Sequence, residues 1–246
     1  MPHADAYHRF DATLREPIRQ FAGHLQQLAG GQAIGLTIYG AALDADSAAS
    51  LISDDTSRRI TSVLSVETVD LEMLRRLAID GAKLHRTRFA PPLVMTGEMI
   101  RRSLDSFPLE LLEIHQQHAT VLGDDPFAAL EFEAQPLRVQ CERELRSMAL
   151  AMRQALLVSG GEERALDELQ RYAGDGLLRV LRGLLWLRDE KSFVAAERAI
   201  SASEATAGRP LAACRAAIER RGHTGWEHFK RLYAEIEALG NLADAS

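Results

Sequence analysis

The chain has 246 residues and a formal net charge of −6, with 46% hydrophobic and 26% charged residues. This composition is typical of a folded globular protein, and the length allows one large domain or two small ones. The negative charge argues against a general nucleic-acid coat, because proteins that coat phosphate backbones carry an excess of Lys and Arg.

Cysteine usage and hydropathy indicate a cytoplasmic protein without a membrane partner. Cys141 and Cys214 lie far apart in the sequence, as reduced thiols do, and do not form a disulfide framework. The N-terminus has no basic-then-apolar signal pattern. The most apolar run, residues 176–188, is too short to span a bilayer and contains Arg179 and Arg182.

The first ninety residues predict a helix, two strands and a second helix. Apolar residues spaced by three or four between positions 7 and 28 indicate an amphipathic helix that ends at Gly30 and Gly31. Pro17 lies inside it and should kink the helix or begin a second one. The segments expected to follow are a buried strand at 33–40, a loop at 41–57, a strand at 59–67 and a helix at 69–83.

The next forty residues are expected to be mainly extended. Prolines bias residues 89–96 away from helix, and a short helix should follow from Thr96 to Leu104. The apolar segment 107–123 is mostly strand-like. Asp124, Asp125 and Pro126 form a helix-start signal, an acidic cap followed by proline.

After about residue 135 the apolar spacing becomes purely helical. A stripe from Leu137 to Leu156 predicts a long helix that ends at residues 159–161, and four further helices are expected by residue 239. The sequence therefore predicts an α+β protein with a small mixed β-sheet followed by an all-α helical bundle. The expected divisions are an N-terminal helix at 1–30 that packs on the first domain, an α/β domain at 31–133 and a helical bundle at 134–246.

Four segments carry a resemblance to a known group of proteins. They are "IGLTIYGAAL" from residue 34, "RITSVLSVETVDLEMLRRL" from 59, "APPLVMTGEMIRRSLDSFPLELLEIHQQHATVLGDDP" from 90 and "LRVQCERELRSMALAMRQALL" from 137. Together they resemble an uncharacterised bacterial nucleotidyltransferase-like family, in which a minimal nucleotidyltransferase domain precedes a helical bundle. The resemblance covers roughly residues 10 to 190 and implies a fold rather than an activity.

The resemblance also implies where a nucleotide and its metal would bind. Active members of the superfamily carry Gly-Ser at the turn after the first strand and Asp-x-Asp on the second strand, where alternate carboxylates hold Mg²⁺. Here Gly40 is followed by Ala41, and Arg59, Ile60 and Thr61 stand in place of the acidic motif. We therefore expect no catalytic residues and no cofactor. The scaffold is expected to bind a nucleotide or small anion near Gly40, Ala41, Arg59 and Thr61, with Arg59 in place of the metal charge.

An alternative places a displaced Mg²⁺ site in the loop, which would keep the enzyme active. Its acids would be Asp44 and Asp46, or Asp54 and Asp55. Loop acids lack the rigid strand that such a site needs. The helical half is the expected contact for a protein partner or for a second copy of the chain, and the sequence names no substrate.

The remaining polar motifs are expected to occupy surface or ion-paired positions without a ligand. Glu110 and Glu113 are expected on opposite faces of a strand, exposed or paired with an Arg. A metal site at His115 and His118 is disfavoured against a surface position for both. Two further candidate sites are also disfavoured, a phosphate contact on a helix face and a ribonuclease-like motif. Their residues are Arg143, Arg146 and Arg153 for the first, and Arg221 and His228 for the second.

Overall fold

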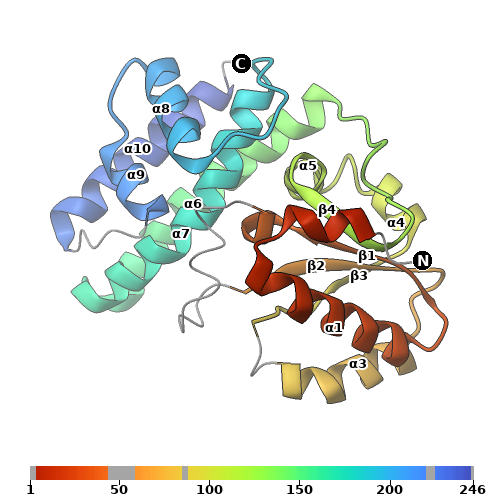
Figure 1. Ribbon diagram of the computed structural model, residues 1–246. Coiled ribbons are helices and arrows are strands. Elements are labelled where there is room, and N and C mark those ends of the chain that lie inside the picture. Colours follow the sequence, from red (N-terminus) through yellow and green to blue (C-terminus); the bar gives the residue numbers. More distant parts are fainter. Residues whose placement is uncertain (1–3, 44–58, 85–87, 220–224, 245–246) are drawn as a thin grey trace. The chain divides into compact units, whose positions relative to one another are not determined.

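The computed structural model describes residues 4–43, 59–84, 88–219 and 225–244 (Figure 1). The protein is α+β, as expected, with a four-stranded mixed sheet and a set of helices. The chain divides into two compact units, one of residues 1–104 and 113–131 and the other of residues 105–112 and 132–246. The segment 105–112 thus belongs to the helical unit, although it precedes the last strand of the sheet.

The first unit contains the sheet and its helices. Its elements in chain order are η1 (Ala4–Arg9), α1 (Ala12–Ala29), β1 (Ala33–Tyr39), η2 (Gly40–Leu43), β2 (Thr61–Val66), α3 (Leu71–Leu84), β3 (Leu93–Met95), α4 (Gly97–Arg102) and β4 (His118–Gly123). Helix α5 (Pro108–Gln116) begins in the second unit and ends in the first.

The sheet has the strand order β3-β2-β1-β4. Strand β1 is antiparallel to both β2 and β4, whereas β2 and β3 are parallel. Gly35 pairs with Ser65 on one side and Gly123 on the other, and Tyr39 pairs with Thr61 and His118. Tyr39 is therefore the centre of a row of three side chains at the carboxyl end of β1, and directly paired residues point to the same face of a sheet.

One face of the sheet forms an apolar core with α1 and α3, which lie together on that side in Figure 1. Leu36, Ile38 and Leu64 of the strands are fully buried there, with Phe21 of α1 stacked on Phe89 at 4.1 Å between ring centroids. This is the face that the alternating pattern of β1 and the three-four spacing of α1 present to each other.

The opposite face of the sheet is more polar. Thr37 and Thr120 are buried and share a hydrogen bond of 2.8 Å between their hydroxyl oxygens. Ser65, on the same face, is also buried. The row of Thr61, Tyr39 and His118 continues this face to the end of β1.

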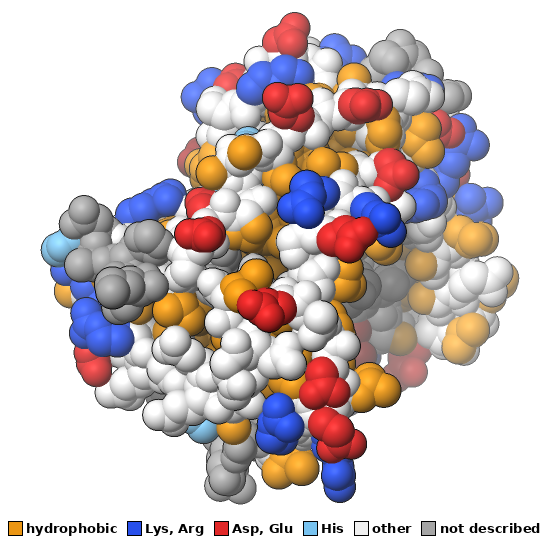
Figure 2. Space-filling model, turned by 90° about the vertical axis from the view of Figure 1, so that its right-hand side faces the viewer, with side chains coloured by type: hydrophobic (Ala, Val, Ile, Leu, Met, Phe, Trp, Pro, Cys, Tyr) orange, Lys and Arg blue, Asp and Glu red, His pale blue; other side chains and the backbone are white. Residues whose placement is uncertain are grey.

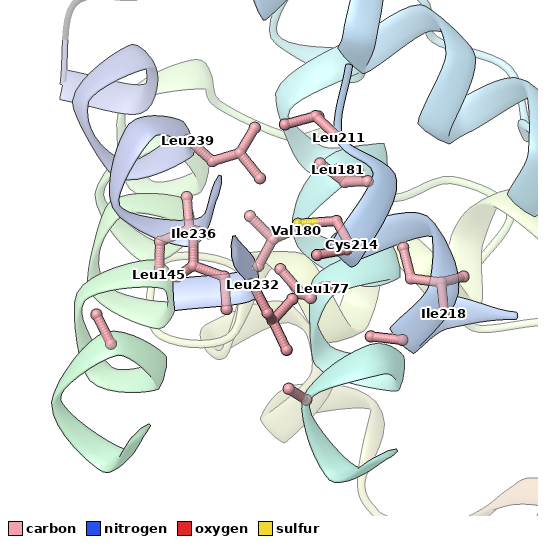
Figure 3. Packing of buried hydrophobic residues seen from close by; sticks show 14 of the residues in the cluster. Leu145, Leu177, Val180, Leu181, Leu211, Cys214, Ile218, Leu232, Ile236 and Leu239 are labelled. Atoms are coloured by element: carbon pink, nitrogen blue, oxygen red, sulfur yellow. The ribbon is translucent and has the colours of Figure 1, made fainter. Parts of the chain in front are cut away.

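The second unit is a helical assembly. It contains α6 (Ala134–Ser159), α7 (Glu163–Trp186), α8 (Ala196–Ala207), α9 (Ala212–Ile218) and α10 (Trp226–Asp244). Its core is a cluster of leucines and isoleucines from α6, α7, α9 and α10, in which Leu145 and Leu181 are at most 1% exposed (Figure 3). Cys141 and Cys214 are buried in this cluster as free thiols, and burial raises the pKa of the Cys141 thiol to about 12.

The structure corrects two predictions about local structure. Residues 108–116 are the helix α5, not strand, and only His118–Gly123 of that segment pair in the sheet. Pro17 does not begin a second helix but lies inside α1, and the single helix predicted from residue 7 is instead interrupted at Phe10 and Asp11, between η1 and α1. The Asp11 carboxylate accepts from the Thr13 amide at 2.8 Å and thereby fixes the start of α1.

Hydropathy gives no candidate for a bilayer-spanning element. Over the described ranges, every helix is either too short or too polar for that role.

Candidate functional site

Gly40 closes strand β1 and begins η2. Its φ of +73° lies in the left-handed region that favours glycine, so the residue is required for the turn. Its N–H donates to the carbonyl of Gln117 at 3.1 Å and so binds the end of β1 to the start of β4. The turn therefore exists where the sequence places it, with its amide used inside the fold.

Thr61 and Ala41 flank this turn. Thr61 is the first residue of β2, and its hydroxyl donates to the carbonyl oxygen of Tyr39 at 2.9 Å. This hydrogen bond holds the end of β1 against the start of β2. The resemblance would put a metal ligand at this position. Ala41 is half-buried and packs against the apolar core of the first unit.

Arg59 is the charged residue of the predicted site. It is half-buried and lies two positions before Thr61. Ile60, between them, forms a parallel bridge with Phe89, and its N–H donates to the carbonyl of Arg88 at 2.7 Å. Extended backbone at Ile60 places Arg59 and Thr61 on the same side of the sheet, and Arg88 lies on the adjacent chain segment. Both arginines take part in further interactions within the fold.

His118, which is half-buried, pairs with the exposed Asp125 beside the same row. The His118 Nε2 lies 2.9 Å from the Asp125 carboxylate, and its Nδ1 lies 2.8 Å from the carbonyl oxygen of Ile114. Both ring nitrogens lie within hydrogen-bond distance of acceptor oxygens, so both are engaged inside the fold. The guanidinium of Arg9 also donates to the His118 carbonyl and ties η1 to β4.

Asp125 is held ionised by its surroundings. Burial raises the pKa of its carboxyl, but hydrogen bonds from His118 and from the backbone N–H groups of Phe127 and Ala128 outweigh burial and lower it to about 2. Asp125 caps a turn at 126–129, not the helix that the sequence predicts. The surface assignment of the histidines is also wrong, because His118 is 11% exposed and the half-buried His115 bonds the carbonyl of Phe127.

Glu110 and Glu113 lie on helix α5 rather than on a strand, because the segment is helical. The Glu110 carboxylate accepts from Arg179 at 3.1 Å and from the Gln140 side-chain amide at 2.7 Å. The expected pairing with an arginine is therefore found for Glu110. Gln140, 3% exposed, also accepts from the N–H of Leu109 at 2.8 Å, so this network fixes the start of α5.

Several predicted positions fall outside the described residues. They are Asp44, Asp46, Asp54, Asp55 and Arg221. His228, the described member of the ribonuclease-like pair, is half-buried in α10. Within the described ranges, the side chains bring together no group of three or more His, Cys, Asp or Glu suited to a metal ion.

Sequence reasoning missed two residues of this edge, Tyr39 and Gln117, and it did not pair His118 with Asp125. The signal available for Tyr39 was its place directly before Gly40. On the face shown in Figure 2, basic and acidic side chains are intermixed, so that face carries no large surface of a single charge.

A scan against models of known protein families found no match to this chain. A search of curated proteins likewise returned no matching protein. The chemistry of the edge is therefore argued from its own residues.

Proposed function

We propose that the first unit is a nucleotidyltransferase-like scaffold that has lost metal-dependent transfer and acts as a binding module for a nucleotide phosphate or another small anion. The observation that supports this most is Thr61. The resemblance would align it with a metal-binding carboxylate of active nucleotidyltransferases, and its hydroxyl is already bonded to the Tyr39 carbonyl. Mg²⁺ prefers ionised oxygen ligands in octahedral geometry, which a neutral, engaged hydroxyl does not supply.

The hydrogen bonds of the neighbouring groups hold the end of the sheet together and favour a structural role over metal binding. The Gly40 amide is bonded to Gln117, and both nitrogens of His118 are engaged. Strand β2, Thr61–Val66, has the sequence TSVLSV and carries no acidic residue. A two-metal reaction would require at least a pair of converging carboxylates at this place.

Two arginines lie at the β2 side of this edge, and the ionised Asp125 lies at its β4 side beside His118. Arg59 and Arg88 lie on adjacent chain segments, joined by the bond from Ile60 to the Arg88 carbonyl. Guanidinium groups bind phosphate oxygens in bidentate geometry, and they do so without a metal. An incoming anion would have to displace the present interactions of these arginines. A phosphate ester without a bound metal ion would do so best.

Isothermal titration of the full chain with ATP in EDTA, and separately with Mg-ATP, tests this proposal. We expect binding that does not need the metal, with no release of pyrophosphate. Arg59→Ala should weaken the binding free energy by about 1.5–3 kcal/mol, the range of a charge-assisted hydrogen bond. The matched control is Arg75→Ala, an exposed arginine of α3 in the same unit.

Binding that requires Mg²⁺, together with pyrophosphate release, would refute the proposal. That result would favour the displaced site at Asp44 and Asp46, which could be checked with Asp44→Asn and Asp46→Asn. Equal affinity of the Arg59→Ala variant and the native chain would remove Arg59 from the site.

A further inference from the structure

Helix α6 has an apolar stripe on one side and a stripe of exposed apolar and basic residues on the opposite side. The inner stripe includes Leu137, Cys141, Leu145 and Met152, all at most 1% exposed in the core of the helical unit. A helix that only covered a core would be polar on its other side.

The second stripe, here named the outer α6 stripe, follows the solvent side at intervals of three, four or seven residues. It consists of Val139, Arg143, Arg146, Leu150 and Leu157. Its apolar members are 46%, 53% and 74% exposed in chain order, and Val158 beside the last is 86% exposed. Single exposed apolar residues need no explanation, but a regular series along one helix is typical of a helix-docking surface.

The middle of the outer α6 stripe borders a hollow of about 340 Å³. Among the described residues its lining comes from α6 alone, with Val139 and Leu150 at its apolar ends and two arginines between them. Arg146 pairs with the half-buried Glu142 at 2.6 Å and has a further interaction within the fold, so Arg143 is the principal cation that the stripe offers to a partner. Arg143 is exposed and makes no hydrogen bond or ion pair with another residue that the structure describes.

We propose that the outer α6 stripe is the docking surface for an acidic amphipathic helix of a partner protein. Val139, Leu150 and Leu157 would receive its apolar side chains, and Arg143 and Arg146 would pair with carboxylates between them. The charge of the stripe argues for this partner, because the chain as a whole is negative by six charges while the centre of this stripe has two arginines against Glu142.

A second copy of the chain fits the stripe less well. Two-fold pairing of a helix places the same residues on both sides of the axis. Centred on the stripe from Val139 to Leu157, it would bring Arg143 against Arg153 of the other copy, which is exposed and lies 3.8 Å from the Glu237 carboxylate of its own chain. Like charges set opposite each other oppose such a dimer, whereas an acidic helix neutralises them.

The length of the stripe defines a suitable probe. At a rise of about 1.5 Å per residue the stripe is about 27 Å long, which a helical peptide of about 20 residues covers. We would use a labelled synthetic peptide with Leu at the core heptad positions and Glu at the flanking ones. The matched peptides carry Gln or Lys in place of Glu. Fluorescence anisotropy with the full chain then gives each dissociation constant.

We expect the Glu peptide to bind at least about tenfold more tightly than the Gln peptide, and the Lys peptide most weakly. Arg143→Glu should weaken binding of the Glu peptide by about tenfold or more, and Leu150→Asp should do the same through the apolar contact. The control is Arg164→Glu, an exposed arginine of α7 that is 85% exposed and should leave the affinity within about twofold. Circular dichroism of each variant confirms that the helices are retained.

Three results would overturn the proposal. The first is equal binding of the three peptides, or none at concentrations up to about 1 mM. The second is self-association of the chain in analytical ultracentrifugation that Leu150→Asp abolishes, which would make a second copy the occupant. The third is binding to vesicles of phosphatidylserine and phosphatidylcholine that Arg143→Glu abolishes while no peptide binds, which would make a lipid surface the ligand. None of these results depends on whether the first unit binds a phosphate.

Discussion

Replacement of Gln140 by leucine should destabilise the helical unit by removing the bonds that start α5. The side chain of Gln140 accepts from the Leu109 N–H at 2.8 Å and donates to the Glu110 carboxylate at 2.7 Å. Leu109 is the second residue of α5, so its N–H has no partner within the helix. Leucine has nearly the same size and leaves that buried N–H unsatisfied.

The magnitude follows from the two bonds. An orphaned buried N–H costs about 1–3 kcal/mol, and the lost bond to a carboxylate about 1.5–3 kcal/mol in a buried setting. Glu110 keeps its pair with Arg179 and is 36% exposed, so the second contribution is discounted. We expect a loss of about 2–4 kcal/mol in the free energy of unfolding by urea. Gln154→Leu, the same change at an exposed position of α6, should cost no more than about 0.5 kcal/mol.

Gln140→Glu gives a second, sharper test. The new carboxylate still accepts from Leu109 but faces the carboxylate of Glu110, so the variant should lose stability as the pH rises through the usual carboxyl range of about 4 to 5. Glu110→Gln in the same chain should restore that loss. A shift below about 0.5 kcal/mol for Gln140→Leu, or no dependence on pH for Gln140→Glu, would refute the network.

Three further outcomes are expected. Leu181→Ala should lower the free energy of unfolding by about 2–5 kcal/mol in chemical denaturation, because Leu181 is fully buried; a shift under about 0.5 kcal/mol would contradict its core position. The pKa of Asp125 is lowered to about 2, so its ionised form stabilises the fold above its unfolded value near 4, and this stability is lost as the pH falls from about 4 to 2. Asp125→Asn should remove that part of the acid unfolding curve, and an unchanged curve would mean that the bond to His118 is absent in solution. Gly123→Ala should lower the free energy of unfolding by about 3–5 kcal/mol in chemical denaturation, because φ is +70° and the new methyl group would overlap the carbonyl oxygen of Ile34. An unchanged free energy of unfolding would contradict this.

The elements that the sequence predicts well are those with an unambiguous period. Helix α1 and strands β1 and β2 each present a single apolar pattern, and Gly30 ends α1 with a left-handed φ of 59° as expected. The helices after residue 134 follow the three-four spacing closely, because each buries one stripe against the same core. Local physics was sufficient for these segments.

Helix α5 was missed because it is buried on several sides. Leu109, Leu111, Leu112 and Ile114 are all at most 2% exposed, so the apolar residues follow no helical period and the segment reads as a strand. Pro108 at the first helical position, with Glu110 in the first turn, is the signal that favours a helix start. The run of apolar residues outweighed it in the prediction.

The site was only partly predictable because it depends on strand order. The sequence places Gly40 and Thr61 near each other through a hairpin, 22 residues separating Thr61 from Tyr39. The neighbour on the other side of β1 is β4, and the bonded pair of Thr37 and Thr120 is 83 residues apart. No local sequence pattern predicts that β4 pairs with β1 rather than with β3. The position of His118 beside Tyr39 could therefore be seen only in the structure.

The ribosome makes β4 well after β1, and this order has a consequence for folding during synthesis. Strand β1 emerges early, but its second partner follows only after the segment 105–112, whose Leu109 and Glu110 bond to Gln140 and Arg179 further on. A nascent chain that stops at Leu104 would hold β1 with one open edge, a template for pairing with other chains. A stable short fragment should therefore extend through Glu131, and the protein is expected to complete its sheet only when about half of the chain has been made.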